Sequence, residues 1–75
     1  MTTTYQFTAL IEREGEDYVA LCPELDIASQ GATVEVARQN LKEAIELFLE
    51  DASTNEVQQR LKKDLFITRL EIAVG

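Results

Sequence analysis

The chain has 75 residues, of which 45% are hydrophobic and 28% are charged. This composition is typical of an ordinary globular protein and excludes a disordered tail. A chain of this length holds one domain, residues 1–75, with a modest core, because it buries only about 60% of the surface that its unfolded form exposes. We therefore expect a homodimer or higher homo-oligomer to contribute stability.

Acidic residues outnumber basic residues by 14 to 7, which gives a formal net charge of −7. Negative charge opposes approach to phosphate backbones and anionic lipids, so we expect this chain alone to bind no nucleic acid directly and no membrane. Two roles for the charge stay open, namely solubility and attraction of a basic partner. No stretch approaches the ~20 apolar residues of a membrane span, and the first residues lack the pattern of a signal peptide.

Cys22 is the sole cysteine, which excludes an intrachain disulfide and a cysteine-based zinc site. A reducing compartment suits such a protein, so we expect a cytoplasmic location. No cationic residue adjoins Cys22 in the sequence to lower its pKa. A buried packing role is therefore favoured over a reactive thiol.

Three strands are predicted in the first half of the chain. Apolar and polar residues alternate over residues 5–11, as in a strand with one buried face. A turn at 14–17 leads into a second short strand, 18–22, which Pro23 ends because it has no N–H to donate. A third extended piece follows at 27–30. The order predicts an antiparallel meander.

A long amphipathic helix is predicted from residue 34 to about residue 50. Thr33 is a good N-cap for it. The charged positions fall on the arc of the helical wheel opposite the apolar positions, so we expect them to face water. The apolar arc consists of Val34, Ala37, Leu41, Ala44, Ile45, Phe48, Leu49 and Ala52.

Ser53 and Glu56 have the spacing of a capping box, which predicts a short helix from Glu56 to about Lys63. Residues 65–74 then show a strand pattern with apolar residues on both faces, which suits a strand flanked by other strands or by another subunit. The predicted fold class is α+β with β-β-β-α-β order, in which one antiparallel sheet of about four strands carries the long helix on one face.

No catalytic constellation is apparent in the sequence. The chain has no histidine to serve as the base of a nucleophilic triad. Glu24 and Asp26 are the only carboxylates outside the solvated helix face that suggest metal-assisted hydrolysis, and a turn-stabilising role is favoured for Asp26. We expect no enzymatic activity, no metal and no cofactor. A residual nuclease acting through these two carboxylates stays as a third alternative.

Positive charge is densest at Arg60, Lys62 and Lys63, directly before Asp64. Three basic side chains in an acidic protein more often lie in solvent than on a nucleic acid. No second helix of recognition type follows a first helix across a tight turn in the predicted elements, so we expect no helix-turn-helix.

One flank of the long helix does not follow the amphipathic pattern. Val36 and Leu47 lie outside the apolar arc and close to each other on the wheel, with Asn40 and Glu43 between them. An apolar pair beside carboxylates resembles the centre and rim of a protein contact surface. Scattered surface apolar residues are the other explanation. The candidate partner-binding residues are Val36, Asn40, Glu43, Leu47 and Glu50.

The segment from Tyr18 to the end of the long helix carries a family resemblance. Its specific parts are Tyr18-Val-Ala-Leu-Cys-Pro-Glu-Leu, Ser29-Gln-Gly, Thr33-Val-Glu35 and a spaced set, Ala37, Asn40, Leu41, Ala44 and Glu46. Over residues 5 to 50 the chain resembles the HicB-like antitoxins, in a short form that lacks the C-terminal DNA-binding segment. Ala32 and Val36 stand where family members often have acidic residues.

The resemblance implies a partial RNase H-like fold and a type II toxin–antitoxin role. In such a system the acidic HicB protein binds and inhibits a small, basic HicA-type ribonuclease, and the toxin carries the catalysis. Many members bind their operator through a following segment. Because this sequence ends at Gly75, we expect no operator binding by this chain. The alternative is an orphan homo-oligomeric scaffold or small-molecule-binding domain without enzymatic activity.

Overall fold

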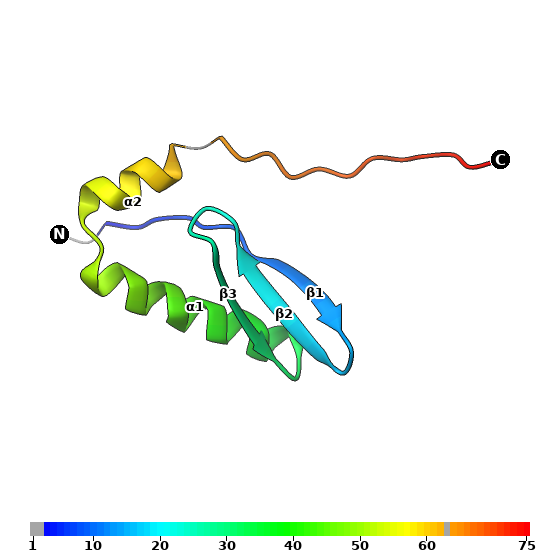
Figure 1. Ribbon diagram of the computed structural model, residues 1–75, viewed down its shortest axis with the longest axis horizontal. Coiled ribbons are helices and arrows are strands. Elements are labelled where there is room, and N and C mark those ends of the chain that lie inside the picture. The colour runs from blue at the N-terminus through cyan, green and yellow to red at the C-terminus, as the bar shows by residue number, and fades with distance from the viewer. Residues whose placement is uncertain (1–2, 63) are drawn as a thin grey trace.

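A computed structural model of the chain describes residues 3–62 and 64–75 (Figure 1). Three strands come first, followed by a long helix, a short helix and an extended C-terminal segment. The long helix packs on one face of the sheet, so the predicted α+β class and its β-β-β-α order are confirmed.

The sheet is an antiparallel meander of β1 (Leu10–Glu14), β2 (Asp17–Cys22) and β3 (Ile27–Gly31), in the order β1-β2-β3. Gly15 forms the tight turn between β1 and β2 with a φ of 64°, a left-handed conformation that glycine adopts without steric cost. Along the two strands Leu10 pairs with Leu21 and Ile11 pairs with Ala20. The predicted meander is therefore confirmed.

The first strand begins at Leu10, later than the alternation over residues 5–11 predicted. Continuing the β1–β2 register places Thr8 opposite Pro23, which has no N–H for a ladder. The N–H of Thr8 instead donates to the carboxylate of Glu24, at 3.0 and 3.1 Å from its two oxygens. Residues 3–9 are therefore outside the ladder and are held in place by a side chain.

Helix α1 (Val34–Asp51) begins as predicted, because the Thr33 hydroxyl accepts a hydrogen bond from the N–H of Val36 at 3.1 Å. Its apolar arc faces β2 and β3, and the charged positions predicted to face water are exposed. The core is small, as expected for a short chain. Its buried residues are Ala20, Cys22, Leu25, Ala37, Leu41 and Ile45, with Phe7, Ile11, Tyr18, Ile27, Phe48 and Leu49 packed around them.

β3 and α1 approach each other closely at Gly31. A Cβ atom at this position would lie 2.6 Å from the backbone nitrogen of Ala37 and 2.6 Å from a methyl carbon of Val36. The same junction is tied by Asn40, whose side-chain amide donates to the carbonyl of Gln30 at 2.8 Å. The first turns of α1 therefore lie against the C-terminal end of β3, at Gln30 and Gly31.

Helix α2 (Thr54–Leu61) is capped by Ser53, whose hydroxyl accepts from the N–H of Glu56 at 3.1 Å. The predicted cap is confirmed, and the helix begins two residues earlier than expected. The end predicted near Lys63 lies outside the described residues. Val57 is buried, and the Arg60 guanidinium donates to the carbonyl of Leu25 at 3.4 Å, so α2 is attached to the body of the domain.

Residues 64–75 are extended but form no strand within the described chain, so the predicted fourth strand is not formed. Figure 1 shows this segment leaving the end of α2 and running clear of the sheet. A strand needs a neighbouring backbone to complete its hydrogen bonds, and none lies beside the segment in the single chain. Its apolar side chains are consequently exposed.

Candidate functional site

The predicted partner-binding residues form one continuous stripe along α1, because they recur every three or four residues. Val36 is 45% exposed and Leu47 is 66% exposed, and the carboxylates of Glu43 and Glu50 lie at the surface beside them. An apolar pair within a carboxylate-rich flank is an arrangement that fits a basic protein partner. We call this set of residues, with Asn40, the α1 stripe.

Asn40 has a different environment from the rest of the α1 stripe. It is partly buried, and its amide is engaged with the Gln30 carbonyl of β3. The stripe therefore runs beside the edge of β3, with Asn40 fixing the helix and the other members facing outward. Glu43 accepts a long hydrogen bond from Gln39, at 3.4 Å.

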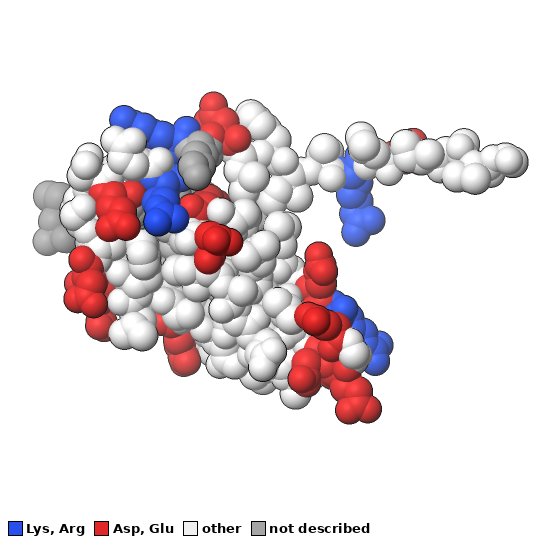
Figure 2. Space-filling view, in the orientation of Figure 1, with Lys and Arg blue, Asp and Glu red and all other residues white. Residues whose placement is uncertain are grey.

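A second acidic surface lies at the turn between β1 and β2, and the sequence analysis did not identify it as a candidate. Figure 2 shows carboxylates gathered at this end of the hairpin. Four acids within six residues were the signal available in the sequence. Arg13, the basic residue among them, donates through its Nε to the Gly15 carbonyl at 3.2 Å. The exposed acids are Glu12, Glu14, Glu16 and Asp17.

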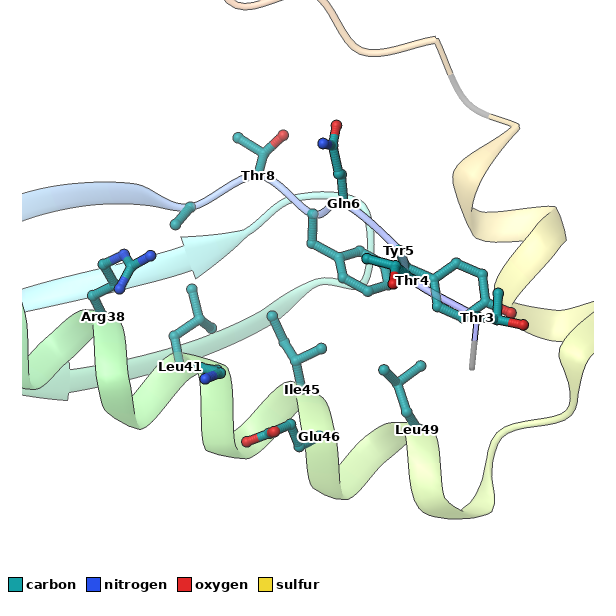
Figure 3. A pocket seen from close by; sticks show the side chains of 13 residues that line it. Thr3, Thr4, Tyr5, Gln6, Thr8, Arg38, Leu41, Ile45, Glu46 and Leu49 are labelled. Atoms are coloured by element: carbon teal, nitrogen blue, oxygen red, sulfur yellow. The ribbon is translucent and has the colours of Figure 1, made fainter. Parts of the chain in front are cut away.

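A groove of about 630 Å³ lies between residues 3–9 and α1. Figure 3 shows Leu41, Ile45 and Leu49 rising from α1 toward this N-terminal segment, while Gln6 and Thr8 point away from the helix. Arg38, Lys42 and Glu46 form the polar rim on the helix side. The groove and the α1 stripe therefore occupy different flanks of the same helix.

Glu24 holds the N-terminal segment to the loop between β2 and β3. Its carboxylate accepts from both the N–H and the hydroxyl of Thr8, the latter at 2.8 Å, and lies 3.5 Å from the Cys22 sulfur. Burial by itself would raise the pKa of Glu24, but the hydrogen bonds from Thr8 and from the backbone outweigh it and lower the pKa below 4.5. Glu24 thus has a structural role.

Cys22 is fully buried in the core, as its packing role predicted. Burial raises the pKa of its thiol, and the neighbouring Glu24 carboxylate raises it further. A high thiol pKa leaves little thiolate at neutral pH, and the thiolate is the reactive form.

Asp26 adopts a left-handed backbone conformation, with a φ of 55°, at the turn before β3. This is the turn role that the sequence favoured. Among residues 3–62 and 64–75, no group of three potential metal-ligating side chains converges.

The basic stretch is divided between different roles. Arg60 reaches the Leu25 carbonyl and lies 3.9 Å from the carboxylate of Glu56, in a partly exposed ion pair. Lys62 is exposed, and Lys63 lies outside the described residues. No helix in the part of the chain that the structure describes is long and apolar enough to cross a membrane.

Replacing Glu24 by Gln should reduce stability in a pH-dependent way. Because the pKa of the folded carboxyl is lowered, its contribution is present above the ordinary value of 4.5 and is lost as the pH falls through the folded pKa. We expect E24Q to lower the free energy of unfolding by about 1 kcal/mol at pH 7 and by progressively less in acid. Urea unfolding at several pH values measures this. Glu16→Gln is the control, and an E24Q effect that is independent of pH would contradict the assignment.

Two curated proteins are similar to this chain over most of its length. One is a UPF0150 protein of Helicobacter pylori strain J99, 42% identical over 66 residues, which are 87% of this chain and 92% of the relative. The other is a UPF0150 protein of Synechocystis, 44% identical over 72 residues, which are 93% of this chain and 90% of the relative. The chain belongs to the UPF0150 family.

Each of the two UPF0150 relatives matches more than four fifths of this chain. No family model matches the sequence. No solved structure matches it either.

Proposed function

We propose that this UPF0150 protein is a cytoplasmic, antitoxin-like inhibitor that binds a small, basic HicA-type ribonuclease and has no enzymatic activity or cofactor of its own. The α1 stripe carries the proposal, because it presents two exposed apolar side chains beside carboxylates on a rigid helix. The resemblance of residues 5–50 to the HicB-like antitoxins supplies the class of partner.

Charge supports the choice of a basic partner. The net charge of −7 and the acidic end of the β1–β2 hairpin produce a negative field that accelerates encounter with a positively charged protein. Apolar contacts then determine how slowly the complex dissociates. In this mechanism the acidic surfaces attract the ribonuclease, and Val36 and Leu47 hold it once it is bound.

The motif residues that precede α1 serve the scaffold. Residues 18–25 form β2 and the turn after it, and Gly31 permits the close approach of β3 to α1. Because these residues build the strands and turns of the fold, we expect the contact surface to lie outside them, on the exposed flank of α1.

The proposal is tested by searching for a small, basic HicA-type reading frame beside this gene and by measuring whether this protein inhibits RNA cleavage by its product. The unmutated protein is expected to inhibit cleavage at a one-to-one ratio. Replacing Val36 and Leu47 together by Lys should weaken inhibition at least about ten-fold, the equivalent of 1.4 kcal/mol of binding free energy. Exposed positions tolerate such changes, so the fold should remain intact.

The matched control replaces Glu35 and Glu46 by Gln, which changes the net charge by the same +2 at exposed positions of α1 outside the stripe. Inhibition by this variant should fall much less, and its association rate should lose part of its dependence on salt. Equal losses in the two double variants would show that only net charge matters. Failure of the unmutated protein to inhibit would overturn the proposal.

The alternative is a homo-oligomeric scaffold or small-molecule-binding domain without a toxin partner. The groove between residues 3–9 and α1 favours it, because 630 Å³ lies within the range of about 300–1,000 Å³ that is usual for ligand sites. Absence of ribonuclease inhibition, together with saturable binding of an apolar fluorescent dye that is weakened in Leu49→Gln while circular dichroism shows an intact fold, would support this alternative.

A further inference from the structure

The C-terminal segment, residues 65–74, has an apolar face that nothing in the single chain covers. Phe66, Leu70, Ile72 and Val74 alternate along it and are 87%, 82%, 73% and 92% exposed. The charged pair Arg69 and Glu71 lies on the other face of an extended chain. Ten extended residues with one face that is apolar except at Thr68 have the pattern of a strand that packs on a core.

The exposed surface of the whole chain also exceeds that of a compact monomer. A monomer of 8.4 kDa is expected to expose about 4,600 Å², whereas this chain exposes 6358 Å². Its radius of gyration is 14.8 Å, against about 11 Å for a compact domain of this length. The surplus of about 1,700 Å² per chain indicates that the single chain is not the complete folded unit.

An acceptor for such a strand lies along residues 3–9. This stretch, Thr-Thr-Tyr-Gln-Phe-Thr-Ala, contains no charged residue, whereas exposed sheet edges are usually protected by charges. The Thr8 N–H turns inward to Glu24, so in an extended chain the N–H groups of Phe7 and Ala9 turn toward the outer edge. The segment therefore presents an unprotected edge.

The groove beside this edge matches the apolar face of the C-terminal segment. Leu41, Ile45 and Leu49 of α1 face this groove (Figure 3), and Phe7 also lines it. A strand added along residues 3–9 would direct alternate side chains into this groove and the others toward the open face of the sheet.

The other sheet edges are less suitable for an added strand. The C-terminal end of β3 is occupied by α1, which approaches closely at Gly31 and donates a hydrogen bond from Asn40 to Gln30. The far end of β1 carries Glu12, Arg13 and Glu14 and so has the charged protection that residues 3–9 lack.

We propose that residues 65–74 pair with residues 3–9 of a second copy of this chain, reciprocally, in a strand-exchanged dimer. α2 is fixed to its own domain by Val57 and Arg60, and only residues 62–64 connect it to the segment, which already projects away from its own sheet (Figures 1 and 2). A short connection of this kind favours exchange between copies over folding back.

In the proposed dimer, Leu70 and Ile72 cover the groove over α1 of the partner copy, and Arg69 and Glu71 remain at the surface. A two-fold axis relates the two exchanged strands. Covering the surplus of both chains would bury about 3,400 Å², which falls in the range of about 2,000–5,000 Å² that is usual for obligate homodimers.

The test combines the molecular mass in solution with the protection of backbone amides against hydrogen exchange. Light scattering should give twice the 8.4 kDa of one chain, and hydrogen exchange should show protected amides within residues 66–74. Leu70→Asp should weaken dimerisation at least about a hundred-fold, because it places a charge in the groove. Arg69→Gln, which changes the net charge equally at the neighbouring position, should remain dimeric.

Three results would overturn strand exchange. A monomeric unmutated protein would do so, and protected amides in that monomer would show that the segment folds onto its own sheet. A dimer whose C-terminal amides exchange freely would place the interface elsewhere. If L70D and R69Q formed equally stable dimers, the apolar face of residues 65–74 would not lie in the interface. Circular dichroism of L70D checks that α1 and α2 remain folded.

Discussion

Leu41→Ala is expected to destabilise the domain by about 2–5 kcal/mol, because it removes a fully buried side chain from the centre of the α1–sheet core. Small domains have a total stability of about 5–15 kcal/mol, so a loss of this size would leave a substantial unfolded population near 37 °C. Urea unfolding followed by circular dichroism measures the change.

Leu47→Ala is the matched control, since it makes the same truncation on the same helix at a side chain that is 66% exposed. Its stability should change by no more than about 0.5 kcal/mol. The pair also separates folding from binding, because Leu47→Ala should weaken inhibition of the ribonuclease without weakening the fold. Similar losses of stability in both variants would contradict the core described above.

Gly31→Ala is expected to cost about 1–3 kcal/mol, as an overpacked contact does. The added Cβ would lie 2.6 Å from the backbone nitrogen of Ala37, and backbone at the start of a helix moves less readily than a side chain. Relieving this steric clash therefore requires α1 to shift away from β3. Such a shift would also strain the hydrogen bond from Asn40 to Gln30. Thermal unfolding and the chemical shifts of the first turn of α1 report the two effects.

Gly15→Asn provides the comparison for Gly31→Ala. Nothing lies within 4 Å of a Cβ at Gly15, and asparagine tolerates its left-handed conformation better than other residues. This variant should lose no more than about 1 kcal/mol. If Gly31→Ala lost as little stability as Gly15→Asn, this would contradict the close packing of α1 on β3.

The two surfaces proposed for binding divide α1 between two partners. The α1 stripe lies beside β3 and is assigned to a basic ribonuclease, whereas the groove lies beside residues 3–9 and is assigned to the exchanged strand of a second copy. Because they occupy different flanks, a dimer could present one α1 stripe from each copy. Mutation of Leu70 and mutation of Leu47 should therefore affect different measurements.

The sequence predicted those features of the candidate site that depend only on the periodicity of a helix. The positions of Val36, Glu43, Leu47 and Glu50 on one flank follow from the 3.6-residue repeat, and they are exposed in the structure. The inward role of Asn40 could not be predicted, because its partner, the Gln30 carbonyl, belongs to a strand whose position beside the helix is a matter of packing.

The sequence by itself determined the features that depend on neighbours along the chain. The meander, the long amphipathic helix and the caps at Thr33 and Ser53 follow from short-range periodicity and from hydroxyl groups that reach N–H groups three residues away. Gly15 and Pro23 mark the turns for equally local reasons, since one permits a positive φ and the other lacks an N–H.

Only the tertiary structure decided which extended segments become strands. Residues 5–9 and 65–74 both alternate as strands do, yet neither joins the ladder of the single chain. A strand's backbone hydrogen bonds come from a separate segment, so the local pattern states that a segment is suited to pairing but not what lies beside it. For residues 5–9 the obstacle is Pro23 across the register. For residues 65–74 the missing neighbour is the one that we assign to a second copy.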